Sequence, residues 1–417
     1  MTPRALDVAP PSAAVVLLAL SIAIAAVDPE TIGSGSWVQP LLLAVVALSG
    51  ALLAVGSGPA PQITGPVGWL AAWLGWAVIG GVLSPEPGTS LLAVASFAAV
   101  GLSGITLAGS SPARDLAYTL GLAGAFSLAM GLTAAAMGRD DAASDRLTLL
   151  FIEPNQLARA AALVLVSSAA LAIHLIRDER NAYQARLTMA AAGGATITLL
   201  LTQSRTGLAA AVVGLIVVGA SRISRSASLA AIAVVAIVFT VGAAAIATDG
   251  IGESVNQTLS RSEIPPDELR TLNGRTVLWP EIVDVARERP VSGHGLGRDR
   301  TVVSRFRAEG RVSWDAEHTH SLPLQLLLTT GVPGLVALAG AVGISVVRCW
   351  RSTASIGRTI LLGTLAVILV DGIVEPTLRV PSYAWLVVVW AAGWALDYRR
   401  PDITVDTNPS ISSTALS

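Results

Sequence analysis

The segment TLNGRTVLWPEIVDVARERPVSGHGLGRDRTVVSRFRAEGRVSWDAEHTHSLPLQLLLTTGVPG, residues 271–334, decides how the chain is interpreted. Its first part is polar and rich in arginine, and it enters an apolar run at His320. The chain on both sides consists of one hydrophobic segment after another. We expect chemistry at this polar island, because it ends in a histidine where a hydrophobic helix begins.

The composition of the whole chain is that of a membrane protein. Its 417 residues are 53% hydrophobic and 13% charged, with a mean hydropathy of +0.66, whereas a soluble domain carries about 25% charged residues. Apolar runs of nearly 20 residues recur, which predicts an all-α polytopic integral membrane protein. The net charge of −1 gives no case for nucleic-acid binding. The single cysteine, Cys349, excludes an intramolecular disulfide and a cysteine-based metal cluster.

Hydrophobic periodicity predicts about twelve transmembrane helices. They are expected at residues 11–27, 40–56, 67–84, 91–109, 116–137, 156–176, 187–203, 206–220, 229–248, 320–347, 359–375 and 381–397. The first is expected to be a retained helix, because no convincing signal-peptide cleavage site follows it. The seventh and eighth are the weakest, because they are short and separated only by Ser204 and Arg205.

Arginine placement predicts the topology. With a cytoplasmic N-terminus, the termini and short inner connections hold 12 arginines and the short outer connections hold 4, as the positive-inside rule requires. We therefore expect nine transmembrane helices in 1–248, an extracytoplasmic capping loop at 249–319, three further helices in 320–397, and a disordered cytoplasmic tail at 398–417. On this topology the loop and the histidine that follows it lie on the extracytoplasmic side of the membrane.

The long loop should fold, because loops of this length are rarely without function. Apolar residues recur in it at helical spacing: Leu278, Ile282 and Val285, with Val277 alongside. Pro280 fits only near the first turn of such a helix, which should end before Pro290. A glycine-rich turn, GHGLG, follows, and VVSRF can begin another short segment.

His320 is the first candidate for catalysis. A helix N-terminus keeps an imidazole neutral, and a neutral imidazole can accept a proton near pH 7, although Glu317 would favour the charged form. A helix-capping role for His320 is the alternative. His318, two residues earlier, competes for the same role. The two histidines with Glu317 fall short of a metal site, because further ligands would have to come from elsewhere, and we predict no metal.

Two arginines are candidates for binding an anion. Arg205 lies between two apolar runs, where an arginine usually faces an aqueous cavity or a bound anion. Guanidinium suits bidentate phosphate contact, whereas the alternative is an interfacial arginine that only marks topology. Arg275 begins the predicted loop helix, near amides that favour anions, although surface arginines are common in loops.

Polar residues also mark the ends of two predicted spans. Pro154 and Asn155 open the sixth, where they favour helix initiation. Asp371 and Glu375 close the eleventh, one helical turn apart. These acids either line an outer cavity or mark the membrane interface.

The motifs together resemble the O-antigen ligase and O-antigen polymerase superfamily of bacterial envelope glycosyltransferases. Its ligase signature is a histidine, then Asn, Ser or Gln, nine residues, a glycine, two residues, and Gly, Thr or Tyr. His320-Ser321, followed by Gly331 and Gly334, matches it completely. Further matching features span about residues 150–335: Pro154-Asn155, Ser204-Arg205, Gly274-Arg275, Trp279, Pro290 and the GHGLG turn. Pro280 departs from the pattern and leaves the position of Arg275 less certain.

The resemblance implies a GT-C-like fold and a glycosyltransferase without cofactor or metal. It would move a glycan from undecaprenyl diphosphate to an acceptor hydroxyl on a glycan, lipid or protein, among membrane lipids and without nucleic acid. His320 would be the base, and Arg205 and Arg275 would bind the diphosphate. Ser204, Asn155, Glu317, His318 and Gly331 are possible supporting residues.

Two alternatives stay open. A polymerase would use a second lipid-linked repeat unit as the acceptor, and the histidine signature favours the ligase. A twelve-span transporter would show internal repeats and polar residues at mid-membrane. The sequence shows no clear half-to-half repeat, so transport is the less favoured reading.

Overall fold

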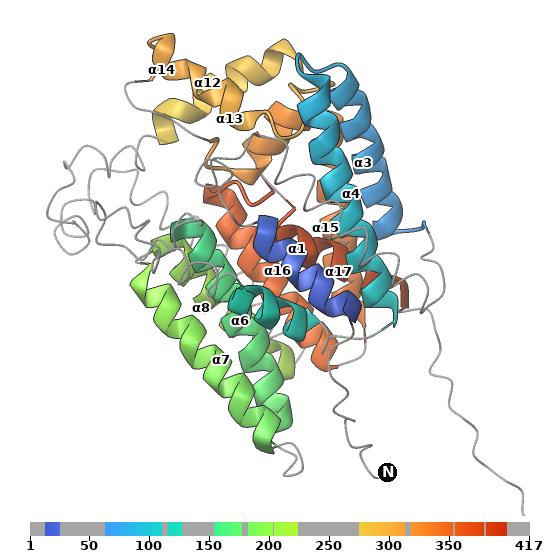
Figure 1. Cartoon of the computed structure of the whole chain (residues 1–417), viewed down its shortest axis with the longest axis vertical. Helices are drawn as coiled ribbons and strands as arrows, with labels where there is room; N and C mark the ends of the chain where they lie inside the picture. The colour runs from blue at the N-terminus through green and yellow to red at the C-terminus, as the bar shows by residue number, and fades with distance from the viewer. Residues whose placement is uncertain are drawn as a thin grey trace, which may run out of the picture.

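The computed structural model describes residues 13–25, 63–110, 116–126, 154–176, 182–202, 204–223, 275–312, 318–352, 355–378 and 381–397. Every regular element within these ranges is a helix, which confirms the all-α prediction for this part of the chain. Figure 1 shows a bundle of long helices that carries a group of shorter helices at one end.

The long helices are α1 (Ala13–Ala25), α3 (Pro66–Val82), α4 (Pro87–Ser110), α6 (Pro154–Leu175), α7 (Ala182–Leu201), α8 (Arg205–Ile223), α15 (Leu322–Arg351), α16 (Ile356–Val374) and α17 (Tyr383–Asp397). A shorter apolar helix spans Leu116–Phe126. The short helices at one end are α12 (Arg275–Glu288), α13 (Asp299–Val303) and α14 (Arg305–Ala308).

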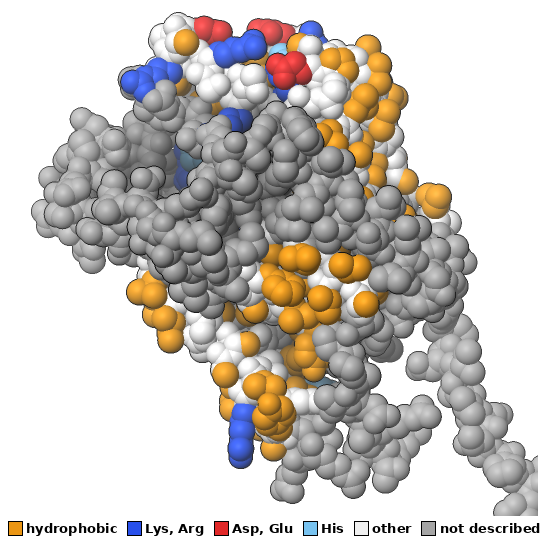
Figure 2. Space-filling view, in the orientation of Figure 1, with side chains coloured by type: hydrophobic (Ala, Val, Ile, Leu, Met, Phe, Trp, Pro, Cys, Tyr) orange, Lys and Arg blue, Asp and Glu red, His pale blue; other side chains and the backbone are white. Residues whose placement is uncertain are grey.

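Four of these helices are long and apolar enough to cross a membrane: Pro87–Ala108, Asn155–Leu175, Leu322–Arg351 and Ile356–Val374. On the face shown in Figure 2, most charged side chains gather at the end formed by α12–α14, and hydrophobic side chains cover the flank below. The chain is therefore an integral membrane protein, and the count of twelve spans stays a prediction. The expected spans at 40–56 and 229–248 and the tail at 398–417 lie outside the described residues.

The two spans with the weakest sequence support are both helical. They were expected at residues 187–203 and 206–220, and α7 and α8 have 20 and 19 residues. Neither is among the four helices that are long and apolar enough to cross a membrane. Whether they cross stays a prediction.

Glycines allow α6, α8 and α16 to approach one another closely. A Cβ atom added at Gly207 of α8 would lie 2.6 Å from the Cβ of Ala158 in α6. At Gly214 it would lie 2.7 Å from side-chain atoms of both Val166 and Val367. Small residues at helix contacts are the usual means of close packing in membranes. These contacts also set the register: α8 runs parallel to α6, and the start of α8 lies level with the start of α6.

The short helices have a hydrophobic core of their own. Leu278 and Ile282 of α12 are fully buried against Val303, Phe306 and the side chain of Leu328 in α15. The helical spacing of the apolar residues predicted this face, and α12 ends before Pro290 as expected. Val277, which was expected beside them, is instead 45% exposed.

Pro280 is inside α12 and not in its first turn, which corrects the sequence prediction. Helix α12 begins at Arg275, so Pro280 is its sixth residue. Proline at this position leaves the carbonyl of Thr276 without its helical donor. The lost bond lies near the helix start, and Pro280 itself is exposed.

Helix α15 is broken at Gly331, the glycine of the ligase signature. Gly331 has φ 68° and ψ −173°, which interrupts the helical backbone, and Pro333 follows. A residue other than glycine is strained at this φ, and a Cβ there would overlap the carbonyl oxygen of Val291. The break leaves the carbonyls before Gly331 without helical partners.

The GHGLG turn supplies the missing partners. The backbone N–H groups of His294 and Gly295 donate to the carbonyls of Leu328 and Thr329, at 2.8 and 3.0 Å. The Val332 N–H, which the break also releases, donates at 2.8 Å to the carbonyl of Pro290.

Helix α3 adds side-chain hydrogen bonds to this contact between the loop and the broken helix, which we call the loop lock. The indole Nε1 of Trp76 donates to the carbonyl oxygens of Thr330 and Val291, at 3.1 and 3.0 Å. Gly293 (φ 66°) lies so close to Thr329 that a Cβ would overlap the backbone. The loop is thus joined to the broken helix by backbone hydrogen bonds.

Candidate active site

His320 lies in a tight turn directly before α15. The predicted span began at His320, whereas α15 begins at Leu322 and Ser321 is its N-cap residue. His320 has φ 48°, and it is the one non-glycine residue with positive φ in the described part of the chain. Such strained positions gather at functional sites. The turn is fixed by Trp279, whose Nε1 donates to the Thr319 carbonyl at 3.1 Å.

Glu375 is the residue at which the candidate site converges. It follows the last residue of α16, and its side chain is 2% exposed. Its Oε1 atom accepts from Nη2 of Arg275 at 2.8 Å and from Nδ2 of Asn155 at 3.0 Å. Its Oε2 atom lies 3.8 Å from Nδ1 of His320. Segments far apart in sequence therefore meet at one carboxylate.

Arg275 lies between Glu375 and His320. Its Nη2 atom is 3.5 Å from Nδ1 of His320, and its side chain is 12% exposed. A guanidinium has five N–H donors, and among the described residues the buried Nε of Arg275 has no hydrogen-bond partner. The structure thus brings together two of the three principal sequence candidates, His320 and Arg275.

Burial and neighbouring charges act on His320 in opposite directions. Burial lowers the pKa of His320, Glu375 raises it, and His318 and Arg275 lower it, with a net value below the ordinary 6.5. Burial alone would raise the pKa of Glu375, but the contacts with His320 and Arg275 outweigh it and hold that pKa below its ordinary value. The neutral imidazole needed for a base is therefore the favoured form at neutral pH.

A ladder of polar pairs joins α6 to α16 beneath the site. Asn155 and Arg159 are one turn apart on α6, and Glu375 and Asp371 are one turn apart at the end of α16. Asn155 meets Glu375, and the buried guanidinium of Arg159 pairs with the fully buried carboxylate of Asp371. The sequence holds a signal for this ladder, because each of the two apolar helices carries a pair of polar residues four positions apart.

Arg205 is at the same end of the bundle, on the exposed surface. It is the first residue of α8, and Gly207 packs on Ala158, one residue before Arg159. This register places Arg205 level with the polar ladder. Ser204 is buried and caps α8, because its hydroxyl accepts the Gly207 N–H at 3.2 Å. Ser204 thus positions the helix start that carries Arg205.

His318 packs against His320, and the described residues offer one group that could hold a cation. The two rings are 3.9 Å apart between centroids and nearly perpendicular. One ligand atom each from His318, His320 and Glu375 lie within 4.8 Å of one another. The guanidinium of Arg275 bonds to Glu375 and lies beside His320, so a positive charge already occupies the approach to this group. We therefore do not identify these residues as metal ligands.

The remaining sequence candidates have structural roles or lie outside the described residues. Gly331 forms the break in α15. The ring of His294 is buried in the loop, with Nε2 3.1 Å from the Val285 carbonyl oxygen. Glu317 is not among the described residues.

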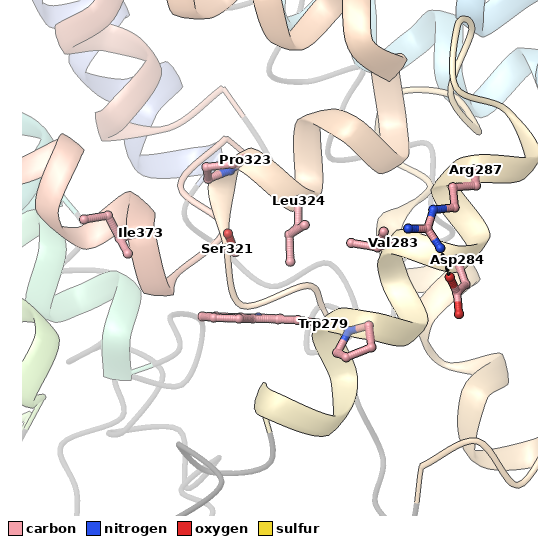
Figure 3. A pocket seen from close by; sticks show the side chains of 9 residues that line it. Trp279, Val283, Asp284, Arg287, Ser321, Pro323, Leu324 and Ile373 are labelled. Atoms are coloured by element: carbon pink, nitrogen blue, oxygen red, sulfur yellow. Dashed lines mark hydrogen bonds and ion pairs between the residues drawn. The ribbon is translucent and has the colours of Figure 1, made fainter. Parts of the chain in front are cut away.

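An apolar groove of 720 Å³ opens beside the His320 turn. Its lining comes from α12, from the start of α15 and from α16: Trp279, Pro280, Val283, Asp284, Arg287, Ser321, Pro323, Leu324 and Ile373. In Figure 3, Val283 and Leu324 point into the groove from α12 and α15, and the ring of Trp279 forms a wall. The groove lies next to the site, because Ser321, which lines it, follows His320 in the chain, although His320, Arg275 and Glu375 do not line it themselves. The ion pair of Arg287 with Asp284 marks its edge.

Fold and site together define a class: an all-helical membrane protein in which a strained histidine, an arginine and a buried carboxylate meet beside an apolar groove. Residues 187–339 match the model of a protein family described as O-antigen ligase. The match confirms the resemblance to the O-antigen ligase and polymerase superfamily, and it covers α7, α8, the loop helices and the break in α15. The comparison with curated proteins gave no match.

The family supports a general activity. Its members are ligases and polymerases of the glycosyltransferase kind, which act on a lipid-linked glycan and an acceptor in cell-envelope synthesis.

Proposed function

We propose that the protein transfers a glycan from an undecaprenyl-diphosphate carrier to an acceptor hydroxyl, on the outer face of a bacterial plasma membrane and without metal. The observation that carries this proposal is the meeting of His320 with Arg275 and Glu375 beside an apolar groove. An amphipathic donor with an anionic head needs such a combination of a cationic site and an apolar path.

In this mechanism His320 is the base. A ring nitrogen takes the proton of the acceptor hydroxyl while its oxygen bonds to the anomeric carbon. The bond from that carbon to the diphosphate oxygen breaks, and its electron pair stays on the diphosphate. Attack opposite the leaving group inverts the anomeric carbon. The proton on His320 then passes to solvent, and the products are the new glycoside and undecaprenyl diphosphate.

The two arginines stabilise the leaving group. Preorganised cationic donors lower the barrier most when they face the position where charge develops. Two observations support this role for Arg275. Glu375 holds its guanidinium through Nη2, and its buried Nε–H has no partner among the described residues, so this group can donate to the diphosphate. Arg205 supports it by its register at the same end of the bundle, exposed to an incoming donor.

The groove suits the polyprenyl chain of the donor. It is apolar, and it begins at Ser321 beside His320. Ile373, on the membrane helix α16, also lines it and is 49% exposed. A chain entering from the membrane along Ile373 would bring its diphosphate to Arg275. A GT-C-like fold with twelve spans, cytoplasmic termini and an extracytoplasmic loop at 249–319 completes the proposal.

A transfer assay tests the function. Purified protein is incubated with a lipid-diphosphate-linked glycan, a chelator and an acceptor, and released undecaprenyl diphosphate is measured. His320→Ala should reduce transfer by about 10²–10⁴-fold, the contribution of a general base. Transfer by this variant at the wild-type rate would disprove the base assignment, and restoration of chelated enzyme by a divalent cation would disprove the metal-free mechanism.

The acceptor separates ligase from polymerase. A ligase should transfer to a different glycan, lipid or protein hydroxyl, whereas a polymerase should lengthen a second lipid-linked repeat unit. The histidine signature favours the ligase, so we expect product with the unlike acceptor. Chain growth with donor alone would assign the polymerase instead.

A further inference from the structure

Within the proposed function, on which this step depends, we infer that Glu375 is a positioning residue that holds Arg275 beside His320 and supplies the counter-charge of the base. The carboxylate contacts His320 and Arg275 but is buried behind both, so it orients the reacting groups without meeting the acceptor. Neither the sequence motifs nor the family match assigns a role to this residue.

The surroundings of Glu375 are built around a fixed carboxylate. A buried charge is costly unless it is paired and hydrogen-bonded. Glu375 meets this requirement with partners from α6, α12 and the turn before α15: Asn155, Arg275 and His320. Each partner lies on a separately packed segment, so the position of the carboxylate is determined from three sides.

The two oxygens of Glu375 have different neighbours. Oε1 accepts from Arg275 and Asn155, and Oε2 lies 3.8 Å from Nδ1 of His320. At this distance the carboxylate acts on the ring as a negative charge and not through a hydrogen bond. Nη2 of Arg275 lies 3.5 Å from the same Nδ1, so the carboxylate also balances the positive charge beside the base.

Without Glu375 the base would lie beside an unpaired positive charge. Nη2 of Arg275 is 3.5 Å from Nδ1 of His320 and is held at 2.8 Å by the carboxylate. His320 becomes cationic when it accepts a proton, and this cation is disfavoured beside a guanidinium that has lost its carboxylate partner.

The charged groups near His320 determine in which direction each substitution should move the pKa of the base, and this direction tests the role of Glu375. Glu375 favours the charged ring, whereas Arg275 and His318 disfavour it. Behind Glu375, Asp371 is paired with Arg159. Removing the negative or the positive neighbour should therefore move the titration of the base in opposite directions.

The experiment is the pH profile of kcat/KM for transfer by the full-length protein. Glu375→Gln should move the acid limb to lower pH and lower the plateau by about 10²-fold, because the base loses its counter-charge and Arg275 loses its partner. Arg275→Gln should move the limb to higher pH. Glu375→Asp, which keeps the charge, should keep the limb near its wild-type position even where the plateau falls.

Asn155→Ala is the matched control, because it removes one partner of Oε1 without removing a charge. The acid limb of the pH profile of this variant should stay at the wild-type pH. A role of Glu375 in folding alone would lower the amount of folded protein, measured by size-exclusion chromatography, and leave the limb of the folded fraction unmoved. An unmoved limb in folded Glu375→Gln, or in Arg275→Gln where Glu375→Gln does not fold, overturns the inference.

His320→Asn separates failure of this inference from failure of the proposed function. If His320→Asn transfers at the wild-type rate, His320 is not the base and the proposed mechanism fails. If His320→Asn is inactive and Glu375→Gln has a wild-type profile and plateau, the mechanism stands and the role of Glu375 is wrong.

Discussion

Two regions of the molecule hold the candidate site by different physical means. The α6–α16 pair contributes Asn155 and Glu375, and it is held by close helix packing and a ladder of buried polar pairs. The loop helix α12 contributes Arg275, and the loop is held to α15 by backbone hydrogen bonds across the break at Gly331. His320 lies where the two regions meet.

The difference shows where each region can tolerate change. In the membrane ladder every charge is buried, so its stability depends on exact matching of partners. In the loop lock most bonds join backbone groups and Trp76 adds side-chain bonds, so side chains other than Trp76 are free to vary except where a Cβ would collide or a φ must be positive. Substitutions in the two regions should therefore differ in size and in consequence.

The largest effect is expected from breaking the buried pair in the ladder. Arg159→Ala leaves the carboxylate of Asp371 fully buried without its partner, which should lower the free energy of unfolding by about 3–5 kcal/mol. The amount of monodisperse protein and its thermal stability in detergent measure this.

The double variant Arg159→Leu/Asp371→Leu is the control for that experiment. Replacing both charges by apolar groups removes the unpaired ion, so much of the lost stability should return. A double variant less stable than Arg159→Ala would show that the ion pair stabilises the fold by more than avoiding an unpaired buried charge.

The next effect concerns the loop lock. Gly331→Ala forces a side chain into a positive φ, which costs about 1–3 kcal/mol, and also places a Cβ against the carbonyl of Val291. The loop should detach, seen as faster proteolysis within 275–312 and lower thermal stability. Gly343→Ala, in the same helix with open space at its Cβ, should cause no loss. Equal proteolysis of the two variants would contradict the lock.

Much of the loop could be predicted from the sequence, because its signals are local. The spacing of Leu278 and Ile282 predicted a helix, Pro290 predicted where it ends, and the GHGLG run predicted a turn. The partner of that turn could not be predicted. It lies in the break of α15, and the glycine of the signature gives no indication of which carbonyls it releases.

The ladder was harder to predict, because its residues are some 220 positions apart in sequence. In the sequence Asp371 and Glu375 form a pair one turn apart, which suits either the lining of an outer cavity or the membrane interface. Asn155 and Arg159 have the same spacing. Only the close packing of α6 on α16 shows that these two pairs face each other, and hence that Glu375 belongs with His320.

A smaller effect should follow from loss of the indole donor of Trp76. Trp76→Phe keeps most of the ring but leaves the Thr330 carbonyl, released by the helix break, without its donor. A loss of about 1 kcal/mol is expected for one hydrogen bond, measured as a lower midpoint of thermal unfolding. Trp69→Phe, a half-exposed indole on the same helix, is the control and should change the midpoint less. The reverse order would show that the bond to Thr330 does not stabilise the lock.

The smallest effect is expected from an ion pair on the loop surface, which is the counterpart of the buried pair in the ladder. Arg287 and Asp284 are 74% and 57% exposed and lie 2.7 Å apart, one turn apart on α12. Water screens such a pair, so Asp284→Asn should change the free energy of unfolding by less than about 0.5 kcal/mol. The thermal midpoint should stay within error of the wild type, and added salt should remove any residual difference. A loss approaching that of Arg159→Ala would mean that this surface is covered in the working protein, and that the loop and the ladder do not differ in the way proposed.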